Sequence, residues 1–251
     1  MILVGMTGPI GHGKTTFAEA LKTAEPNSEK IETSDVISEV VEALNQQTKS
    51  LPLVNDLRSI NKWLEALPPI ISRVLHQRID WQQLKLTNSA VASNPGDYAK
   101  LFEYITNLHD KPQLLQQTIN EFNKKDYRNI QQWLGGYLVT HVDTDIWYNE
   151  ILRRSKLADK KGLRLYIIGG VRFLSDAAYV HRAGGIIVSI NRPNIALRDI
   201  DDPTERERSQ IITDTTVLND ASVEQLLVVA RRLWLDIQAN QLQPQYRASQ
   251  T

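Results

Sequence analysis

The residues best suited to chemistry lie near the start of the chain, in a glycine-rich segment that ends in a lysine and a threonine. Residues 8–15 read GPIGHGKT, which fits the pattern GxxxxGK[ST], and they follow an apolar run at residues 1–6 that predicts a buried strand. Glycines allow backbone N–H groups to turn inward around phosphate oxygens, and a helix that begins near Lys14 would point its positive dipole end at the same anion. The segment therefore predicts a phosphate-binding loop, the P-loop.

The expected ligand of this loop is ATP, accompanied by Mg²⁺. Lys14 is expected to reach the terminal phosphates, and the hydroxyl of Thr15 is expected to bind Mg²⁺, which prefers an octahedral shell of oxygen atoms. His12 is interpreted as incidental to this chemistry. The residues expected to contact the nucleotide are Gly8, Gly11, His12, Gly13, Lys14, Thr15, Thr16 and Arg192.

Composition excludes several classes of function. The chain has 251 residues, enough for a substantial core, and its 29 Lys and Arg balance its 29 Asp and Glu, so general nucleic-acid binding is not expected. It has no cysteine, which excludes zinc fingers and thiol catalysis and fits a reducing cytosol. No stretch approaches the roughly 18 apolar residues of a membrane span. We therefore expect a soluble, cytoplasmic protein without a membrane partner.

Apolar runs and helical spacing place the loop in an α/β fold. Helical segments separate short strands that are expected at residues 1–6, 30–33, 163–171, 185–190 and 215–218. This alternation predicts a three-layer P-loop NTPase fold, with a five-stranded parallel sheet whose ligands bind at the carboxyl ends of the strands. The expected core comprises residues 1–36 and 161–251, and residues 37–160 form a large helical insertion that would bind the acceptor.

Local signals predict where several helices begin and end. Ser34 and Asp35 are expected to cap a helix that begins near Val36, and Ser222 with Gln225 fits a capping box. Turns inside the insertion are expected at residues 68–69, 93–97 and 110–112, each of which contains proline. Trp63, Trp81, Trp133 and Trp147 are expected at core positions, with stacking on the acceptor as the alternative. Solvated or capping positions are expected for His76, His109, His141 and His181.

Arginines in the second half of the chain favour phosphoryl transfer over other uses of such a loop. The Asn-Lys-x-Asp pattern that reads guanine in GTPases does not follow any predicted strand, and Gly169 and Gly170 stand where a motor ATPase shows acidic residues. Always-charged arginines suit the neutralisation of a moving phosphoryl group. Residues 194–213 are a candidate lid, or alternatively a solvated charged loop, and the arginines concerned are Arg172, Arg192, Arg198, Arg206 and Arg208.

Three blocks of sequence carry a resemblance to a known family. The first is the P-loop, and the second is residues 127–135, YRNIQQWLG, followed by Trp147. The third begins at residues 171–177, VRFLSDA, and continues through a strand and Arg192-Pro193 to Asn219-Asp220. Together they resemble the phage-type deoxynucleoside monophosphate kinases, which are relatives of dephospho-coenzyme A kinase.

The resemblance implies a role for each matching residue. It implies that Lys14 and Thr15 bind the phosphates and Mg²⁺, and that Arg172 contacts the acceptor phosphate or the transferred one. Asp35 is a candidate for orienting a Mg²⁺-bound water or the acceptor, or a plain helix cap. The implied acceptor site consists of Asp35, Arg128, Gln132 and Arg172, and the catalytic set of Lys14, Arg172, Arg206 and Arg208. Alternatively, Arg128 and Gln132 are polar residues on the surface of a helix, and Arg172 is an ion-pair partner at the end of a strand.

The sequence also departs from this family. Gly170 replaces an aspartate before Val-Arg-Phe, Thr140 and His141 stand where an arginine is common, and residues 205–209 replace the usual lid pattern. The nucleotide specificity therefore stays open.

These observations predict an ATP-dependent kinase that phosphorylates a (deoxy)nucleoside monophosphate, a small-molecule nucleotide acceptor. There are three alternatives. The protein could be a kinase for another small acceptor such as dephospho-coenzyme A, a nucleotide-dependent switch that binds a partner through the insertion, or a motor that acts on nucleic acid. Whether the protein forms a homodimer is left open.

Overall fold

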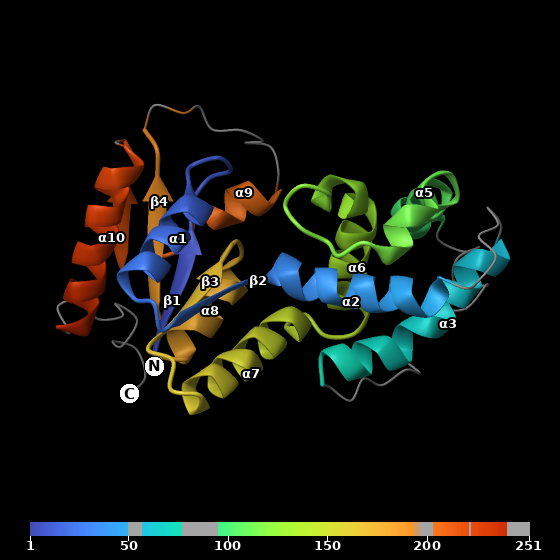
Figure 1. Cartoon of the computed structure of the whole chain (residues 1–251), viewed down its shortest axis with the longest axis horizontal. Coiled ribbons are helices and arrows are strands. Elements are labelled where there is room, and N and C mark those ends of the chain that lie inside the picture. The colour runs from blue at the N-terminus through green and yellow to red at the C-terminus, as the bar shows by residue number, and fades with distance from the viewer. Residues whose placement is uncertain (50–56, 77–94, 194, 196–202, 221, 240–251) are drawn as a thin grey trace. The chain divides into compact units, whose positions relative to one another are not determined.

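Two compact units make up the chain. The computed structural model describes residues 1–49, 57–76, 95–193, 195, 203–220 and 222–239. The sheet unit comprises Met1–Thr33 and Ile151–Thr251, and the helical unit comprises Ser34–Glu150 (Figure 1). The sequence places the corresponding helical insertion at residues 37–160, so the helical unit begins three residues earlier and ends ten residues earlier than the predicted insertion.

Five parallel strands form the sheet, in the order β2-β3-β1-β4-β5 (Figure 1). They are β1 (Ile2–Thr7), β2 (Ser28–Glu32), β3 (Leu165–Gly169), β4 (Ile186–Asn191) and β5 (Thr215–Leu218). The sheet confirms the predicted α/β class, and its topology is consistent with that of P-loop proteins. In such a sheet, all the carboxyl ends of the strands meet at one edge.

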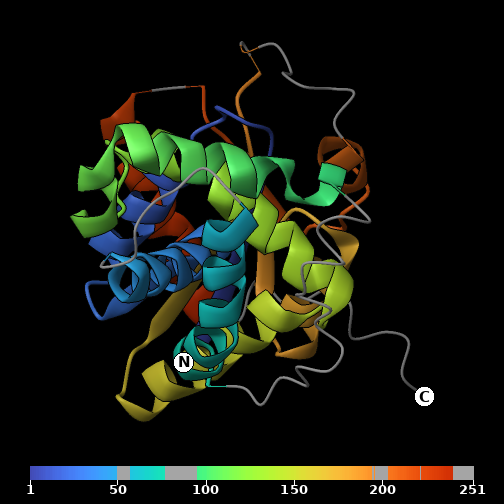
Figure 2. The ribbon, with the colours of Figure 1, turned by 90° about the vertical axis from the view of Figure 1, so that its right-hand side faces the viewer.

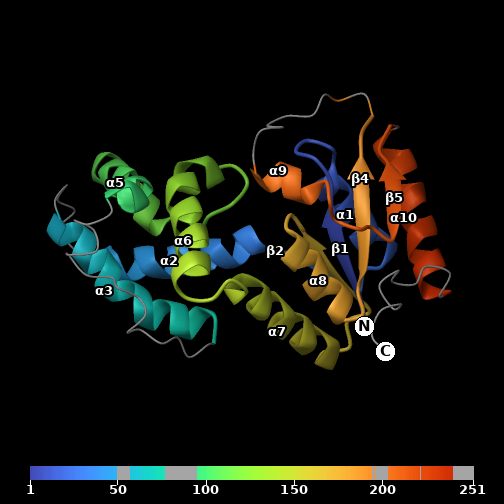
Figure 3. The same ribbon diagram turned by 180° about the vertical axis from the view of Figure 1, so that it is seen from behind.

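Helices pack on both faces of the sheet, as Figure 3 shows from behind. The helices that pack on the sheet are α1 (Lys14–Ala24), α8 (Leu174–Arg182) and α10 (Val223–Gln238), and the short helix α9 (Pro203–Arg208) belongs to the same unit. Val4 and Met6 of β1 belong to a buried cluster with Phe17 of α1 and Trp234 of α10, whereas α8 packs on β1 and β4. Full burial of such a side chain contributes about 1.5–3 kcal/mol.

The helical unit contains no strand among the residues that the structure describes, as its sequence predicts. Its elements, seen from the side in Figure 2, are α2 (Thr33–Thr48), α3 (Leu57–Val74), α5 (Pro95–Asp110), the 3₁₀ turns η1 (Pro112–Gln116) and η2 (Lys124–Tyr127), α6 (Arg128–His141) and the start of α7 (Ile146–Lys160).

Aromatic side chains fill the interior of the helical unit. Trp63, Trp133 and Trp147 are buried, which confirms their predicted core positions. The ring of Trp63 meets that of Tyr104 edge-on at 5.8 Å, and Trp133 stacks on Tyr137 at 5.1 Å. Such pairs add about 0.5–1.5 kcal/mol beyond the burial of area. Trp81 lies outside the described residues.

Two of the predicted turns differ from the structure. Residues 68–69 lie inside α3, because the buried face that includes Leu64, Leu67 and Ile70 continues past them. Burial therefore outweighs the lost backbone hydrogen bond. The helix α5 begins at Pro95, and proline is suited to the first helical turn. The expected turn at residues 93–97 is therefore also wrong from Pro95 onward. Residues 93 and 94 lie outside the described chain.

Other local predictions agree with the structure more closely. The turn at residues 110–112 is confirmed between α5 and η1, and the capping box at Ser222 and Gln225 forms at α10. The helix α2 begins at Thr33 rather than near Val36, so Ser34 and Asp35 lie in its first turn instead of before it. Among the described residues, no helix is long and apolar enough to cross a membrane.

Candidate functional site

The P-loop connects β1 to α1 at the carboxyl edge of the sheet. Three glycines have left-handed backbones, with φ of 139° at Gly8, 82° at Gly11 and 91° at Gly13. The ammonium group of Lys14 donates hydrogen bonds to the carbonyl oxygens of Gly8 (2.7 Å) and Pro9 (2.8 Å). The loop thus curls around its own lysine at the N-terminus of α1, where backbone N–H groups favour an anion.

The loop rests on the ends of β4 and β5. A Cβ atom at Gly8 would lie 2.2 Å from the carbonyl oxygen of Ile190, and one at Gly13 would lie 2.2 Å from Nδ2 of Asn219. These are sub-van der Waals distances, so both positions require glycine for packing as well as for backbone conformation. By contrast, a Cβ atom at Gly11 would meet no atom within 4 Å.

His12 fixes this arrangement, although its sequence context gives no sign of it. The side chain is 1% exposed, and its Nδ1 accepts a hydrogen bond from the backbone N–H of Arg192 (2.9 Å). The carbonyl oxygen of His12 accepts a second bond from the side-chain amide of Asn219 (2.9 Å). The imidazole of His12 therefore joins the loop to the end of β4, a structural role that the sequence does not predict, while its part in phosphate chemistry stays a prediction.

The arginine-bearing segments of the sheet unit are partly brought together. Arg172 is exposed in the loop before α8, and its backbone N–H donates to Asp176 Oδ2 (3.0 Å), which caps that helix. The helix α9 carries Arg206 and Arg208, and Glu207 between them accepts a bond from the N–H of Leu174 (2.9 Å). The hydrogen bond therefore attaches α9 to the segment that follows Arg172. Residue 194 and residues 196–202 of the expected lid lie outside the described chain.

The end of β3 lacks an acidic residue but has a carboxylate beside it. Gly170 has a left-handed φ of 75°, which favours glycine there. Glu32, the last residue of β2, pairs in register with Gly169, and a Cβ atom at Gly169 would lie 2.7 Å from Cγ and 2.8 Å from Oε1 of Glu32. Sequence reasoning missed Glu32 because the two residues lie far apart in the chain.

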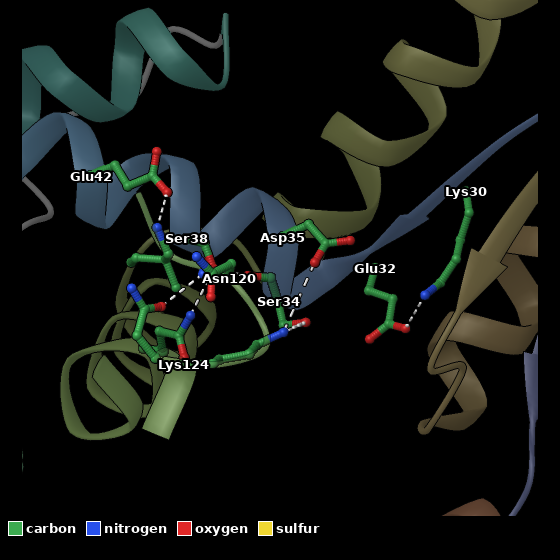
Figure 4. Close-up of polar contacts among 11 residues, drawn as sticks. Lys30, Glu32, Ser34, Asp35, Ser38, Glu42, Asn120 and Lys124 are labelled. Atoms are coloured by element: carbon green, nitrogen blue, oxygen red, sulfur yellow. Dashed lines mark hydrogen bonds and ion pairs between the residues drawn. The ribbon is translucent and has the colours of Figure 1, made fainter. Parts of the chain in front are cut away.

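A polar groove of about 340 Å³ lies within the helical unit. One wall is a single face of α2, and the other is the segment before η2 (Figure 4). Carboxylates predominate around it, with one ammonium group, so the groove favours ligand groups that donate hydrogen bonds. Its lining residues are Asp35, Ser38, Glu39, Glu42, Thr118, Ile119, Asn120, Glu121 and Lys124.

Three hydrogen bonds shape the groove. Glu42 Oε1 accepts from the backbone N–H of Ile119 (2.6 Å), and Lys124 Nζ donates to Ser34 Oγ (3.0 Å) and lies 3.9 Å from Asp35 (Figure 4). Beneath the groove, the buried Gln131 donates to Ser38 Oγ (2.7 Å). Asp35 therefore lines a pocket as its acceptor-binding hypothesis requires.

The other two acceptor candidates in the helical unit occupy the surface of α6. Arg128 is exposed at the start of this helix, and exposed Gln132 accepts a hydrogen bond from Lys100 of α5 (2.9 Å). The neighbouring Gln131, and not Gln132, contacts the groove. Residues 123–126 read NKKD, but they follow no strand and lie next to η2, which differs from the setting of a guanine-reading motif.

Histidine and acidic side chains do not assemble a metal site of their own in the described part of the chain, where no group of three or more could hold an ion. A Mg²⁺ ion would depend on Thr15, on nearby carboxylates and on nucleotide phosphates. His181 differs from the prediction of a solvated or capping residue, because its side chain is buried and bonds Asp214 Oδ2 at 2.9 Å. Asp214 also accepts from the N–H of Ile187, so this pair holds β4 to the segment before β5.

Comparison with known proteins gives no relative from which a role could be transferred. No protein-family model matches the sequence, and no curated protein matches it. What the molecule itself establishes is an α/β protein with a five-stranded, all-parallel sheet and a glycine-rich loop at the carboxyl edge of that sheet.

Proposed function

We propose that the protein is a P-loop kinase that transfers the γ-phosphoryl group of ATP to the phosphate of a (deoxy)nucleoside monophosphate. The observation that carries this proposal is the loop at residues 8–15, with left-handed glycines, an inward-turned Lys14 and a helix N-terminus behind it. The likeness to phage-type deoxynucleoside monophosphate kinases in three blocks of sequence supports the same reaction.

In this reaction an oxygen of the acceptor phosphate attacks the γ-phosphorus of ATP, and the bond from that phosphorus to the β,γ-bridging oxygen breaks. The products are ADP and the nucleoside diphosphate, and no side chain forms a covalent bond. Catalysis then consists of positioning and charge neutralisation. Lys14 would bind the β- and γ-phosphates, and Mg²⁺ bound near Thr15 would neutralise charge on the leaving group. Arg172, Arg206 and Arg208 would stabilise the moving phosphoryl group.

The helical unit would supply the acceptor site. Carboxylates accept hydrogen bonds but donate none, so the groove beside Asp35 suits amino groups of a base and hydroxyls of a sugar. The acceptor phosphate requires cations instead, and Lys124 and Arg128 are the candidates on this unit. A kinase for dephospho-coenzyme A would use the same loop with a different acceptor.

A nucleotide-dependent switch is the second candidate, and the pair Gly169-Gly170 favours it. Hydrolytic and phosphoryl-transfer sites commonly use an acidic residue at that strand end to hold Mg²⁺, and a protein that only binds nucleotide can dispense with it. A switch would bind ATP tightly and release ADP slowly whatever acceptor is added.

The test is ADP release from Mg-ATP across a panel of nucleoside and deoxynucleoside monophosphates and dephospho-coenzyme A. We expect acceptor-dependent turnover that falls roughly 10²- to 10³-fold in Lys14→Ala. The matched control is Lys22→Ala, because Lys22 lies on the same helix but near its other end, in an exposed ion pair with Glu19. ATP binding without acceptor-dependent turnover would reject the kinase in favour of the switch.

A further inference from the structure

At the carboxyl end of β3, the side chain of Glu32 from the neighbouring strand β2 fills the space beside Gly169, which has no side chain of its own. Gly169 ends β3, and Glu32 ends β2 directly beside it. A Cβ atom added at Gly169 would lie 2.7–3.0 Å from Cγ, Oε1 and Cδ of Glu32. The carboxylate of Glu32 therefore occupies the space that a longer residue at position 169 would use.

This carboxylate lies on the face of the sheet that α1 covers. Side chains alternate along a strand, so residue 169 shares a face with Leu165 and Ile167. Both of these residues belong to the buried cluster that contains Phe17 and Leu21 of α1. Glu32 lies in register beside Gly169, so its side chain is on that same face.

The same face and the same edge carry the start of α1. That helix begins at Lys14, directly after the P-loop, and it packs on β1, β2 and β3. The segment that leaves β3 also bonds β1 near the loop, because the N–H of Val171 donates to the carbonyl oxygen of Met6 (2.9 Å). The first turn of α1, which contains Thr15, and Glu32 at the end of β2 thus both lie at the carboxyl edge of the sheet, and α1 covers the face that carries Glu32.

We propose that Glu32 supplies the carboxylate for the Mg²⁺ that accompanies the nucleotide, in place of the acidic residue that β3 lacks. Mg²⁺ is bound in proteins by one or two carboxylates together with phosphate and water oxygens, and this donor set fits Thr15 and Glu32. The inference rests on the proposed function, since it assumes that the loop binds a metal–nucleotide complex. It also removes the main argument for the switch.

In the absence of a metal ion, Lys30 forms an ion pair with the carboxylate of Glu32. Lys30 and Glu32 point to the same face of β2, and Lys30 Nζ lies 3.2 Å from Glu32 Oε1. The two side chains are 16% and 27% exposed, so the ammonium group partly neutralises a carboxylate that solvent reaches only in part. A divalent cation would interact with the same oxygen atoms more strongly.

The experiment compares the ATP dissociation constant in EDTA with that in Mg²⁺, by calorimetry, for folded variants of equal thermal stability. In the wild type we expect Mg²⁺ to tighten binding. Glu32→Gln keeps the size of the side chain. In this variant the ratio of the ATP dissociation constant in EDTA to that in Mg²⁺ should be roughly 10- to 100-fold smaller than in the wild type, while the dissociation constant in EDTA stays unchanged. The matched control is Glu29→Gln on the other face of β2, which should behave as the wild type.

A second variant tests the position of the charge. Glu32→Ala should lose the Mg²⁺ effect, and adding Gly169→Asp to it should restore the effect by returning a carboxylate to β3. A full Mg²⁺ effect in Glu32→Gln, or its failure to return in the double variant, would overturn the inference and leave the kinase intact. Absence of ATP binding in the wild type would overturn the proposed function and this inference with it.

Discussion

The polar sites of the sheet unit and the helical unit are formed in different ways. In the sheet unit, backbone atoms form the P-loop, and contacts with Ile190 and Asn219 at the ends of distant strands fix its shape. In the helical unit, side chains from one face of α2 form the groove, and single hydrogen bonds such as that from Ile119 N–H to Glu42 close it. A backbone site tolerates almost no change, whereas a side-chain site can be altered residue by residue.

If the proposed function holds, this contrast would allow one half of the reaction to stay constant while the other half varies. Under the proposed function, the sheet unit binds ATP, which is common to all members of such a class. The helical unit binds the acceptor, which differs between them. Substitutions should therefore have sharp effects near the P-loop and graded effects near the groove.

The largest effect is expected for Gly8→Ala. The new methyl group would lie 2.2 Å from the backbone oxygen of Ile190, which cannot rotate away, and the backbone has a φ of 139°. We expect the free energy of unfolding of the sheet unit to fall by about 2–4 kcal/mol, measured by urea denaturation. Gly11→Ala is the control, because only its backbone strain of about 1–2 kcal/mol applies. Equal losses in the two variants would contradict the packing argument.

A smaller effect is expected at His12. His12→Leu leaves the N–H of Arg192 without an acceptor in a partly buried position, which should cost about 1–2 kcal/mol and weaken ATP binding. His12→Asn should retain most of the stability, because its side-chain oxygen can take the place of Nδ1. Denaturation and ATP titration of both variants check this point. If Asn and Leu behave alike, the bond to Arg192 contributes little.

In the helical unit, Tyr127 is expected to make the stability depend on pH in the alkaline range. Burial raises the pKa of Tyr127 to about 12, and its hydroxyl donates to the carbonyl oxygen of Leu114 (2.7 Å). In the unfolded chain the phenol ionises near pH 10, so the contribution of the protonated Tyr127 to the free energy of unfolding is fully present below that pH. It is then lost by up to about 1.4 kcal/mol per pH unit as the pH rises toward 12.

Tyr127→Phe should lower stability by about 1 kcal/mol at neutral pH and make the alkaline loss shallower. Denaturation at a series of pH values between about 8 and 12 measures both quantities. Burial also raises the pKa of Tyr104, so some alkaline loss should persist in the variant. An unchanged slope would show that Tyr127 ionises equally well in the folded protein.

The smallest effect is expected at the wall of the groove. Glu42→Ala removes the acceptor for the N–H of Ile119, and about 0.5–1.5 kcal/mol of local stability should be lost. Hydrogen exchange of that amide should quicken while the rest of the unit keeps its protection. Glu42→Gln retains an oxygen and should protect the amide almost as well. Global destabilisation by Glu42→Ala would show that the groove is part of the core.

The sequence predicts the sheet unit better than the helical one, for physical reasons. Short apolar runs bounded by turn residues specify buried parallel strands, and the glycine spacing of the P-loop is a local signal. The capping box at Ser222 is equally local. In the helical unit, the proline pair inside α3 shows that burial of a helix face overrides a strong breaker signal.

Site residues with distant partners are the ones that the sequence does not reveal. His12 bonds Arg192 across 180 positions, and Glu32 fills the space above Gly169 on another strand. No spacing rule connects such residues. A glycine in place of an acidic residue is a visible signal, but only the register of β2 and β3 explains it.

The order of the strands has one further consequence, for the behaviour of the chain at high concentration. The strand β2 lies at an edge of the sheet, where backbone groups could pair with a strand of another molecule. Its sequence, SEKIE, carries three charged side chains in five residues, and charges on an edge strand oppose such pairing. Lys30 and Glu32 would therefore also help to keep the protein from aggregating edge to edge.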